Sequence, residues 1–444
     1  MQALKTTLLF IAVTVFISCS GLQKFSSKER KELSNLLQEA PLGQHYIGLA
    51  VYDLEKEKWL YRHHSDRLFT PASNTKILTF YTGLTIIRDS FYLADTLSQN
   101  NEMVIIPNGN PVFLHPEFQH LQPEWKEALR LEEMKRVRIN DRPTKNKRFG
   151  PGWSWADYPY YYQAEVSSFP IYGNVLWSEW DSLNRSLTVG PDYLLDYTSI
   201  QYDGSKKGIR ISRDEYVNQY EITVGNGVPD QYVRTSPFRF EPYTLSKILE
   251  DTFYRPTSYA YTADQAMKGQ GFHNIPMDTV YRKMMLESDN FLAEQILLMA
   301  SGELGDTLSS KDMIQYMFEH EFSNWENRVQ WVDGSGLSRY NLFSPEFIID
   351  VLVKIESRIG KQNIPTYFPT GGKTGTIKYW YGAEEPYVFA KTGTLSNHHA
   401  LSGFIKTKKG NWLAFSFFND NYIGSSGRIK PGMQKVLEHI RDSY

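Results

Sequence analysis

The chain has 444 residues, of which 41% are hydrophobic and 22% are charged, and these values are ordinary for globular proteins. A chain of this length favours two or three structural units over a single domain. The formal net charge of −2 and the lack of a long basic run argue against nucleic acid as a partner.

The first residues have the pattern of an export signal. Lys5 precedes an apolar run over 8–17, which is too short for a stable membrane span. The single cysteine, Cys19, follows almost directly. This arrangement resembles the lipobox of bacterial lipoproteins, in which the cysteine becomes the acylated first residue; a plain secretory signal with an incidental cysteine is the alternative. We predict a signal peptide over 1–18, a tether over 19–35, and an exported, periplasmic protein that is lipid-anchored to a bacterial membrane.

The next segments predict a β-hairpin followed by a helix. Residues 46–63 contain two β-prone runs around a charged turn. Residues 71–76 read Pro-Ala-Ser-Asn-Thr-Lys and lead into an apolar run with helical spacing. Pro71 suits a helix start, and Ser73 and Lys76 would then share one helix face. A hydroxyl beside an amine that can take its proton is a candidate nucleophile with its base. A helix start with an exposed lysine gives the same pattern, so this motif alone is weak.

Residues 95–240 have a different character. Short aromatic or β-branched runs alternate there with Pro, Gly and Asn turns, which predicts a β-rich domain. We expect this domain to be inserted into a main unit formed by 36–94 and 241–444.

The chain is also rich in aromatic residues, with 29 Tyr and 10 Trp. Aromatic surfaces can stack on sugars or peptides, although packing inside the protein is the commoner role.

After residue 240, apolar residues again recur with helical spacing. This pattern predicts helices over 245–253, 281–300, 313–322 and from Pro345 onward. Two strands over 400–405 and 412–418 are separated by a Lys-Lys-Gly-Asn turn, and a final helix follows near 433–441. Strands at both ends of the chain with helices between them predict an α+β fold, in which helices flank an antiparallel sheet.

Two further polar motifs lie in this part of the chain. Ser288-Asp289-Asn290 interrupts an apolar run, and a buried hydroxyl and amide need partners there. Taken alone, this motif favours a helix N-cap. Lys-Thr-Gly occurs at Lys373 and again at Lys391. A cation, a hydroxyl and a glycine on a strand edge can hold a carboxylate while the backbone approaches closely. We place the site at Lys391, because a strand-like run precedes it, whereas the residues before Lys373 indicate a loop.

Ser-x-x-Lys, Ser-Asp-Asn and Lys-Thr-Gly in this order form the motif set of β-lactamases and penicillin-binding proteins. The chain resembles the low-molecular-mass D-Ala-D-Ala carboxypeptidases and endopeptidases of the penicillin-binding protein 4 type over about residues 40–425. Further matching segments are 152–157, 287–295, 333–339 and 390–395. The resemblance implies a β-lactamase/transpeptidase-like sheet flanked by helices, with a β-rich domain inserted between the first and second catalytic motifs.

The resemblance also implies a penicillin-sensitive serine D-Ala-D-Ala carboxypeptidase, with or without endopeptidase activity, acting on peptidoglycan stem peptides. Ser73 would attack the peptide carbonyl, with neutral Lys76 as its base. Burial beside Lys391 would lower the pKa of Lys76 through desolvation and like-charge repulsion. Ser288 would relay the proton to the leaving amine, and Asn290 would orient Lys76 and the substrate.

The same resemblance gives the Lys-Thr-Gly strand the task of binding the substrate. Lys391 and Thr392 would hold its terminal carboxylate, the group that a β-lactam antibiotic imitates, and Gly393 would let the backbone approach. The backbone N–H groups of Thr394 and Ser73 would form the oxyanion hole.

Asp157 would contact a cationic group of the stem peptide, with an ordinary surface aspartate as the alternative. We expect no metal or other cofactor, because the chain has one cysteine and its histidines lack ligand spacing. A β-lactamase or esterase on the same scaffold and a non-catalytic cell-wall binding protein are the competing functions. The complete motif set argues against the binding protein, and the long insert argues against the β-lactamase.

Overall fold

The computed structural model describes residues 25–261 and 269–444. Cys19, the signal peptide predicted over 1–18 and the first part of the predicted tether lie outside the described residues. Within the part of the chain that is described, no helix is long and apolar enough to cross a membrane.

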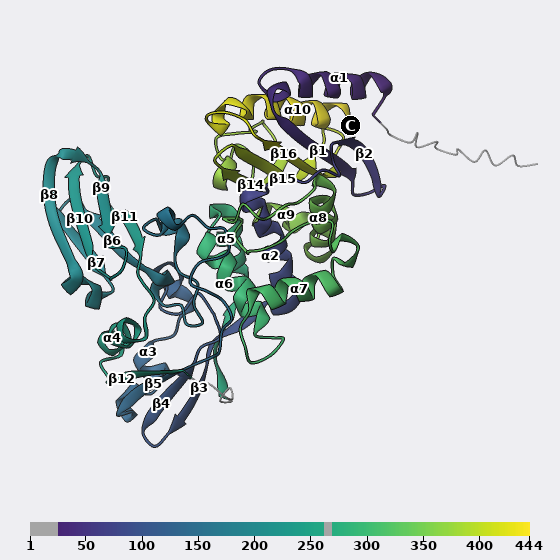
Figure 1. Cartoon of the computed structure of the whole chain (residues 1–444). Coiled ribbons are helices and arrows are strands. Elements are labelled where there is room, and N and C mark those ends of the chain that lie inside the picture. The colour runs from purple at the N-terminus through teal and green to yellow at the C-terminus, as the bar shows by residue number, and fades with distance from the viewer. Residues whose placement is uncertain (1–24, 262–268) are drawn as a thin grey trace, which may run out of the picture.

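A five-stranded sheet forms the centre of the main unit, in the order β14-β15-β16-β1-β2 (Figure 1). Its strands are β1 (Tyr46–Asp53), β2 (Lys58–His63), β14 (Val388–Leu395), β15 (His398–Lys406) and β16 (Trp412–Asp420). All neighbouring strands are antiparallel, and the pairing of Tyr46 with Asp420 joins segments from opposite ends of the chain. The predicted hairpins and the predicted antiparallel sheet are confirmed.

Helices cover both faces of this sheet. On one face α1 (Ser27–Gln38) packs against α10 (Lys430–Ser443), and on the other lie α2 (Lys76–Thr82) and α8 (Pro345–Ile359). Side chains of successive residues in β1 point to opposite faces of the sheet. Leu49 and Val51 therefore join the core on the first face, and Ala50 joins the core on the second. The remaining helices of this unit are α5 (Asp278–Glu287), α6 (Asn290–Ser301), α7 (Ser310–His320) and α9 (Ile364–Tyr367).

The start of α1 shortens the predicted tether. The side chain of Ser26 accepts the backbone N–H of Glu29, and the carboxylate of Glu29 accepts the N–H of Ser26, so the helix begins inside the range 19–35. Leu33 is fully buried against α10. This part of the chain therefore belongs to the folded unit.

Between α2 and α5 the chain builds three further sheets (Figure 1). One has the order β12-β5-β4-β3-β13, the second β11-β6-β7 and the third β8-β10-β9. The elements are β3 (Ser90–Gln99), β4 (Glu102–Ile106), α3 (Trp125–Ala128), β5 (Arg136–Asp141), β6 (Val175–Asp181), β7 (Ser186–Gly190), β8 (Thr198–Lys207), β9 (Ile209–Arg213), β10 (Tyr220–Asn226), β11 (Tyr232–Pro237), α4 (Pro242–Phe253), β12 (Thr257–Tyr261) and β13 (Gln270–Pro276). The β-rich insert between the first two motifs is present.

The strand pairing extends the insert beyond the expected range 95–240. β3 pairs with β13, which brings Ser90 opposite Pro276, and α4 packs against β12 of the same sheet. The expected boundary followed the return of helical spacing at α4, but this helix covers a strand of the insert. We therefore propose that the insert comprises 90–276.

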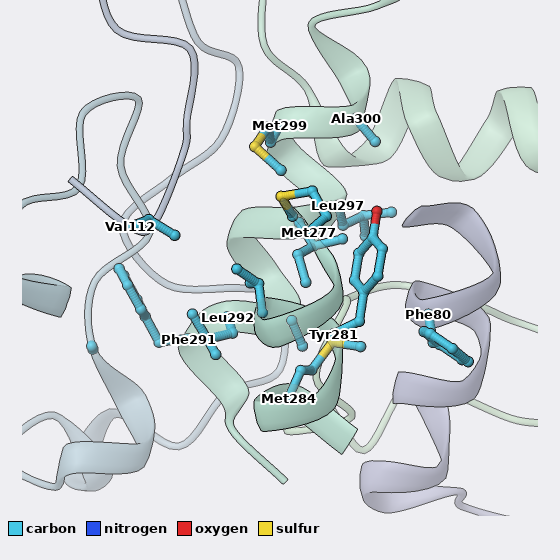
Figure 2. Packing of buried hydrophobic residues seen from close by; sticks show 14 of the residues in the cluster. Phe80, Val112, Met277, Tyr281, Met284, Phe291, Leu292, Leu297, Met299 and Ala300 are labelled. Atoms are coloured by element: carbon cyan, nitrogen blue, oxygen red, sulfur yellow. The ribbon is translucent and has the colours of Figure 1, made fainter. Parts of the chain in front are cut away.

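The helix predicted over 281–300 is two helices, α5 and α6. Ser288 ends α5 with φ 63°, in the left-handed region, and the side chain of Asp289 accepts the backbone N–H of Leu292 to cap α6. Apolar residues flank the junction on both sides, so the spacing alone hid the break. Figure 2 shows these residues packed between Phe80 of α2 and Val112 of the insert, which fixes the junction in place.

Candidate active site

Ser73 and Lys76 meet at the start of α2. Ser73 lies in a single 3-10 turn, η2 (Ala72–Thr75), and is partly exposed, whereas Lys76 is completely buried. Nζ of Lys76 lies 3.0 Å from Oγ of Ser73. In its neutral form this amine has a lone pair that can accept the hydroxyl proton.

The remaining contacts of Lys76 fix its amine. Nζ donates to Oδ1 of Asn290 at 2.6 Å and to the backbone carbonyl of Ser335 at 2.7 Å. The amide nitrogen of Asn290 in turn donates to the carbonyl of Tyr162 at 2.9 Å. Asn290 therefore links the lysine to the insert, and both of its polar atoms have partners.

Lys391 stands in the middle of β14 and is completely buried. Its Nζ donates to Oγ of Ser288 at 2.7 Å and to the carbonyl of Thr392 at 2.9 Å. The left-handed backbone at Ser288 directs its hydroxyl toward the strand rather than along a helix surface. The structure thus brings residues of all three motifs into one cluster.

The outer edge of β14 faces this cluster. Backbone groups of alternate residues on a strand point to the same edge. The N–H of Ala390 donates to the carbonyl of Pro369, on the side away from β15. Thr392 and Thr394 therefore present their backbone groups to this outer edge, and the carbonyl of Thr392 reaches Lys391 there.

Gly393 explains why the third motif contains a glycine. A Cβ at this position would lie 2.3 Å from the carbonyl oxygen of Pro71 and 2.9 Å from the backbone nitrogen of Ser73. Any side chain would push the strand away from the turn that carries Ser73. The glycine thus sets the separation between the candidate nucleophile and the N–H of Thr394.

The other Lys-Thr-Gly copy, at Lys373, does not belong to this cluster. Lys373 is exposed in a turn before η12 (Gly375–Ile377), and the side chain of Thr374 accepts the backbone N–H of Thr370. The hydroxyl of this copy is thus engaged in its own loop. Only Thr376, one residue beyond the motif, reaches the cluster, where it accepts the hydroxyl of Thr392 at 2.7 Å.

Two buried carboxyl groups near Lys76 were not assigned roles from the sequence. Glu294 accepts the backbone N–H groups of Gly334 and Ser335, at 3.1 and 2.7 Å. Asp333 accepts those of Gly336 and Ser338, and also the indole N–H of Trp153 from the insert at 2.9 Å.

Together Glu294 and Asp333 hold the loop whose carbonyl at Ser335 receives Lys76. A sequence signal for one of them exists, because Glu294 lies four residues after Asn290 and therefore on the same helix face.

The protonation of the cluster follows from burial. Burial lowers the pKa of Lys76 to about 8, although the negative charges of Asp333, Glu294 and Asp289 oppose this shift. Burial, followed by the charge of Lys76, also lowers the pKa of Lys391. A substantial fraction of Lys76 is therefore neutral near pH 8, as a general base requires.

Asp157 lies at the end of η6 (Trp155–Asp157), half-buried beside Tyr162. Burial raises the pKa of the Tyr162 phenol to about 12, and the charge of Asp157 and a hydrogen bond to it add to this shift. Asp157 thus sits on the loop that supplies the carbonyl partner of Asn290.

Among the described residues, no group of three or more His, Cys, Asp or Glu is placed to hold a metal ion.

Comparisons with known proteins agree with this arrangement. The model of the D-Ala-D-Ala carboxypeptidase 3 (S13) family matches residues 29–219 and 265–440. The D-alanyl-D-alanine carboxypeptidase DacB of Haemophilus influenzae is 22% identical over 462 residues, which cover 93% of each chain.

Solved structures show the same fold. The crystal structure of penicillin binding protein 4 from Haemophilus influenzae superposes with a TM-score of 0.69 at 18% identity, covering 92% of this chain and 98% of the other. The structure of that protein complexed with a β-lactam gives a TM-score of 0.63 at 19% identity, with the same coverage. The expected penicillin-binding-protein fold is confirmed.

Proposed function

The chain belongs to the D-Ala-D-Ala carboxypeptidase 3 (S13) family of serine peptidases, and on this premise we propose that Ser73 is its nucleophile. The enzyme would remove the terminal D-alanine of peptidoglycan stem peptides through an acyl-enzyme. The observation that carries the proposal is the 3.0 Å contact between Ser73 Oγ and Lys76 Nζ, inside a cluster that unites all three motifs.

Acylation begins when neutral Lys76 takes the hydroxyl proton of Ser73. The Oγ atom attacks the carbonyl carbon between the two D-alanines, and negative charge develops on the carbonyl oxygen. The backbone N–H groups of Ser73 and Thr394 receive this charge. The contact of Gly393 with the nucleophile turn supports this arrangement, because it brings the two N–H groups to one place.

Collapse of the tetrahedral intermediate breaks the peptide bond and requires a proton on the departing amine. Ser288 relays this proton from Lys76 to the amine, and the 2.7 Å hydrogen bond that its hydroxyl accepts from Lys391 supports this role. Water, deprotonated by Lys76, then attacks the ester carbon, and Lys76 returns the proton to the departing Oγ of Ser73. Asn290 keeps Lys76 oriented through both halves of the reaction.

The terminal carboxylate of the substrate is bound by Lys391 and Thr392. Burial and repulsion from Lys76 disfavour the charged form of Lys391. An arriving carboxylate raises the pKa of Lys391 again, because an opposite charge favours the ammonium. The recharged Lys391 then favours the neutral form of Lys76. Substrate binding would in this way prepare the base.

The experiment that tests the function combines penicillin labelling with product release. Intact-protein mass after incubation with benzylpenicillin should show one penicilloyl adduct that lasts many minutes and maps to the peptide containing Ser73. D-alanine should be released from a peptide ending in D-Ala-D-Ala, and prior penicillin should block the release. Penicillin consumed without an adduct would indicate a β-lactamase. No adduct with intact penicillin would indicate a binding protein.

The two Lys-Thr-Gly copies offer a matched pair of variants. Lys391→Ala removes the cation that binds the carboxylate, so we expect the penicillin acylation rate to fall by about 10²-fold. Lys373→Ala changes an exposed loop side chain, so its rate should stay within twofold of wild type. Stopped-flow acylation by a fluorescent penicillin measures both rates. An equal loss in the two variants would contradict the placement of the site on β14.

A D-Ala-D-Ala carboxypeptidase acts on the cell wall and therefore outside the cytoplasm. More finely, we propose that the enzyme is held in the periplasm by a lipid on Cys19, supported by the signal-like residues 1–18. Cys19→Ala should move the enzyme from the membrane fraction to the soluble periplasmic fraction. Unchanged fractionation would contradict the anchor.

We also propose that Asp157 contacts a cationic group of the stem peptide. In that case Asp157→Asn should raise KM only for peptides that carry this group.

A further inference from the structure

We propose that the insert carries a saccharide-binding subsite next to the acylation site, where residues 158–161 meet strands β9 and β11. The subsite would bind an N-acetylated sugar of the glycan to which the stem peptide is attached. The proposal rests on the proposed function, because that function supplies the link between peptide and glycan.

A cavity of about 250 Å³ lies at this junction. Its wall combines tyrosine rings with arginines, among them Tyr158, Tyr160, Tyr161, Arg213 and Arg234. Tyr160 is 48% exposed and Tyr161 is 60% exposed, so neither ring is buried in the core. A tyrosine offers an apolar face and a polar tip, which suits a ring that is apolar on its faces and polar at its rim.

The loop that lines this cavity also contacts the catalytic cluster. The carbonyl of Tyr162 accepts the amide of Asn290, and the ring of Tyr160 stacks on that of Tyr162 with 5.4 Å between centroids. Tyr160 and Tyr161 are one or two residues from Tyr162, so their Cα atoms lie within about 8 Å of its Cα. An extended peptide spans about 3.3–3.6 Å per residue. A stem peptide bound at Ser73 can therefore reach a sugar in this cavity.

Arg213 is held firmly in the wall of this cavity. Its side chain is 1% exposed, and its guanidinium lies 3.6 Å from Glu165 and donates to the carbonyl of Tyr158 at 3.3 Å. Its Nε is buried and has no hydrogen-bond partner among the described residues. Arg234, which also lines the cavity, is exposed. Its guanidinium can donate to a neutral acceptor such as the carbonyl oxygen of an N-acetyl group.

A second cavity, of about 630 Å³, adjoins the first and shares Ser212 and Arg213 with it. Its wall contains the carboxylates of Asp196, Asp214 and Glu221. Carboxylates repel an anionic ligand but accept hydrogen bonds from hydroxyl groups. The carboxylates of the second cavity therefore favour an uncharged saccharide over a phosphate or a peptide carboxylate. The second cavity also has room for a further sugar ring of a strand.

The test compares two substrates with the same D-Ala-D-Ala peptide, one free and one attached to a disaccharide of N-acetylated sugars. In the wild type, KM should be lower for the glycosylated substrate. Tyr161→Ala and Arg234→Ala should each raise this KM by about three- to tenfold. Tyr216→Ala, which removes another exposed tyrosine outside both cavities, should leave it unchanged.

The free peptide separates the possible outcomes. Its KM and kcat, and acylation by benzylpenicillin, should stay within twofold of wild type in the Tyr161 and Arg234 variants. Equal KM values for the two substrates in the wild type would overturn the subsite. So would equal losses on both substrates, because the cavity would then hold peptide or support Asn290. Failure of the proposed function looks different, since wild-type enzyme would then release no D-alanine from either substrate.

Discussion

Ser73→Ala should abolish covalent labelling by benzylpenicillin and lower the rate of D-alanine release by about 10⁴-fold or more. The substitution removes the atom that forms the acyl bond, and the neighbouring amine of Lys76 is buried too deeply to replace it. The fold should survive, since Ser73 is partly exposed and its only described side-chain partner is Lys76. Intact-protein mass and a D-alanine assay measure both effects.

Ser288→Ala is the matched control for this experiment. It also removes a serine hydroxyl from the cluster, but one whose proposed role is to relay a proton. We therefore expect Ser288→Ala to acquire the penicilloyl adduct slowly, whereas Ser73→Ala acquires none. A stable adduct on Ser73→Ala would refute the assignment of the nucleophile, and the modified peptide would then identify the true one.

Lys76→Met should lower the acylation rate by about 10³-fold and remove its dependence on pH. With Lys76 as the proposed base, the wild-type rate should follow its neutral fraction, and burial lowers the pKa of Lys76 to about 8. Below that pH the rate should fall tenfold per unit, because the amine is increasingly protonated, and above it the rate should stop rising. Acylation by a penicillin between pH 5.5 and 9.5 measures this profile.

Methionine is the substitution of choice because it nearly fills the space of the lysine without a charge. Lys373→Met provides the control, since it makes the same chemical change on an exposed loop and should keep the wild-type profile. If Lys76→Met retains a rise in rate with its midpoint near pH 8, another group is the base. Equal melting temperatures for the variants would show that the loss is not one of folding.

The pairing of Ser73 with Lys76 could be predicted from the sequence because it depends on local spacing. Three residues separate the two along the chain, and one helix start suffices to bring them together. The choice of Lys391 over Lys373 was also local, since the strand-like run before Lys391 distinguishes the two copies. The main sheet followed from the runs and turns at each end of the chain.

Features that depend on tertiary packing could not be predicted in this way. The carbonyl of Tyr162 and the indole of Trp153 reach the cluster from the insert, and no spacing rule links them to Asn290 or Asp333. The spacing of apolar residues does not show the break at Ser288, whereas the N-cap interpretation of 288–290 does, and Asp289 caps α6. Nor does spacing show which unit α4 covers, because the pattern is the same in either case.

The pairing of β1 with β16 has a consequence for how the protein is made. β1 precedes the insert and β16 follows it, so the edge of β1 that β16 covers stays unpaired until β16 has been made. The insert is one continuous stretch and can complete its own strand pairs earlier. The turn that carries Ser73 gains its strand neighbour at Gly393 only late in the process. The surroundings of Ser73 are therefore complete only once β14 has joined the sheet.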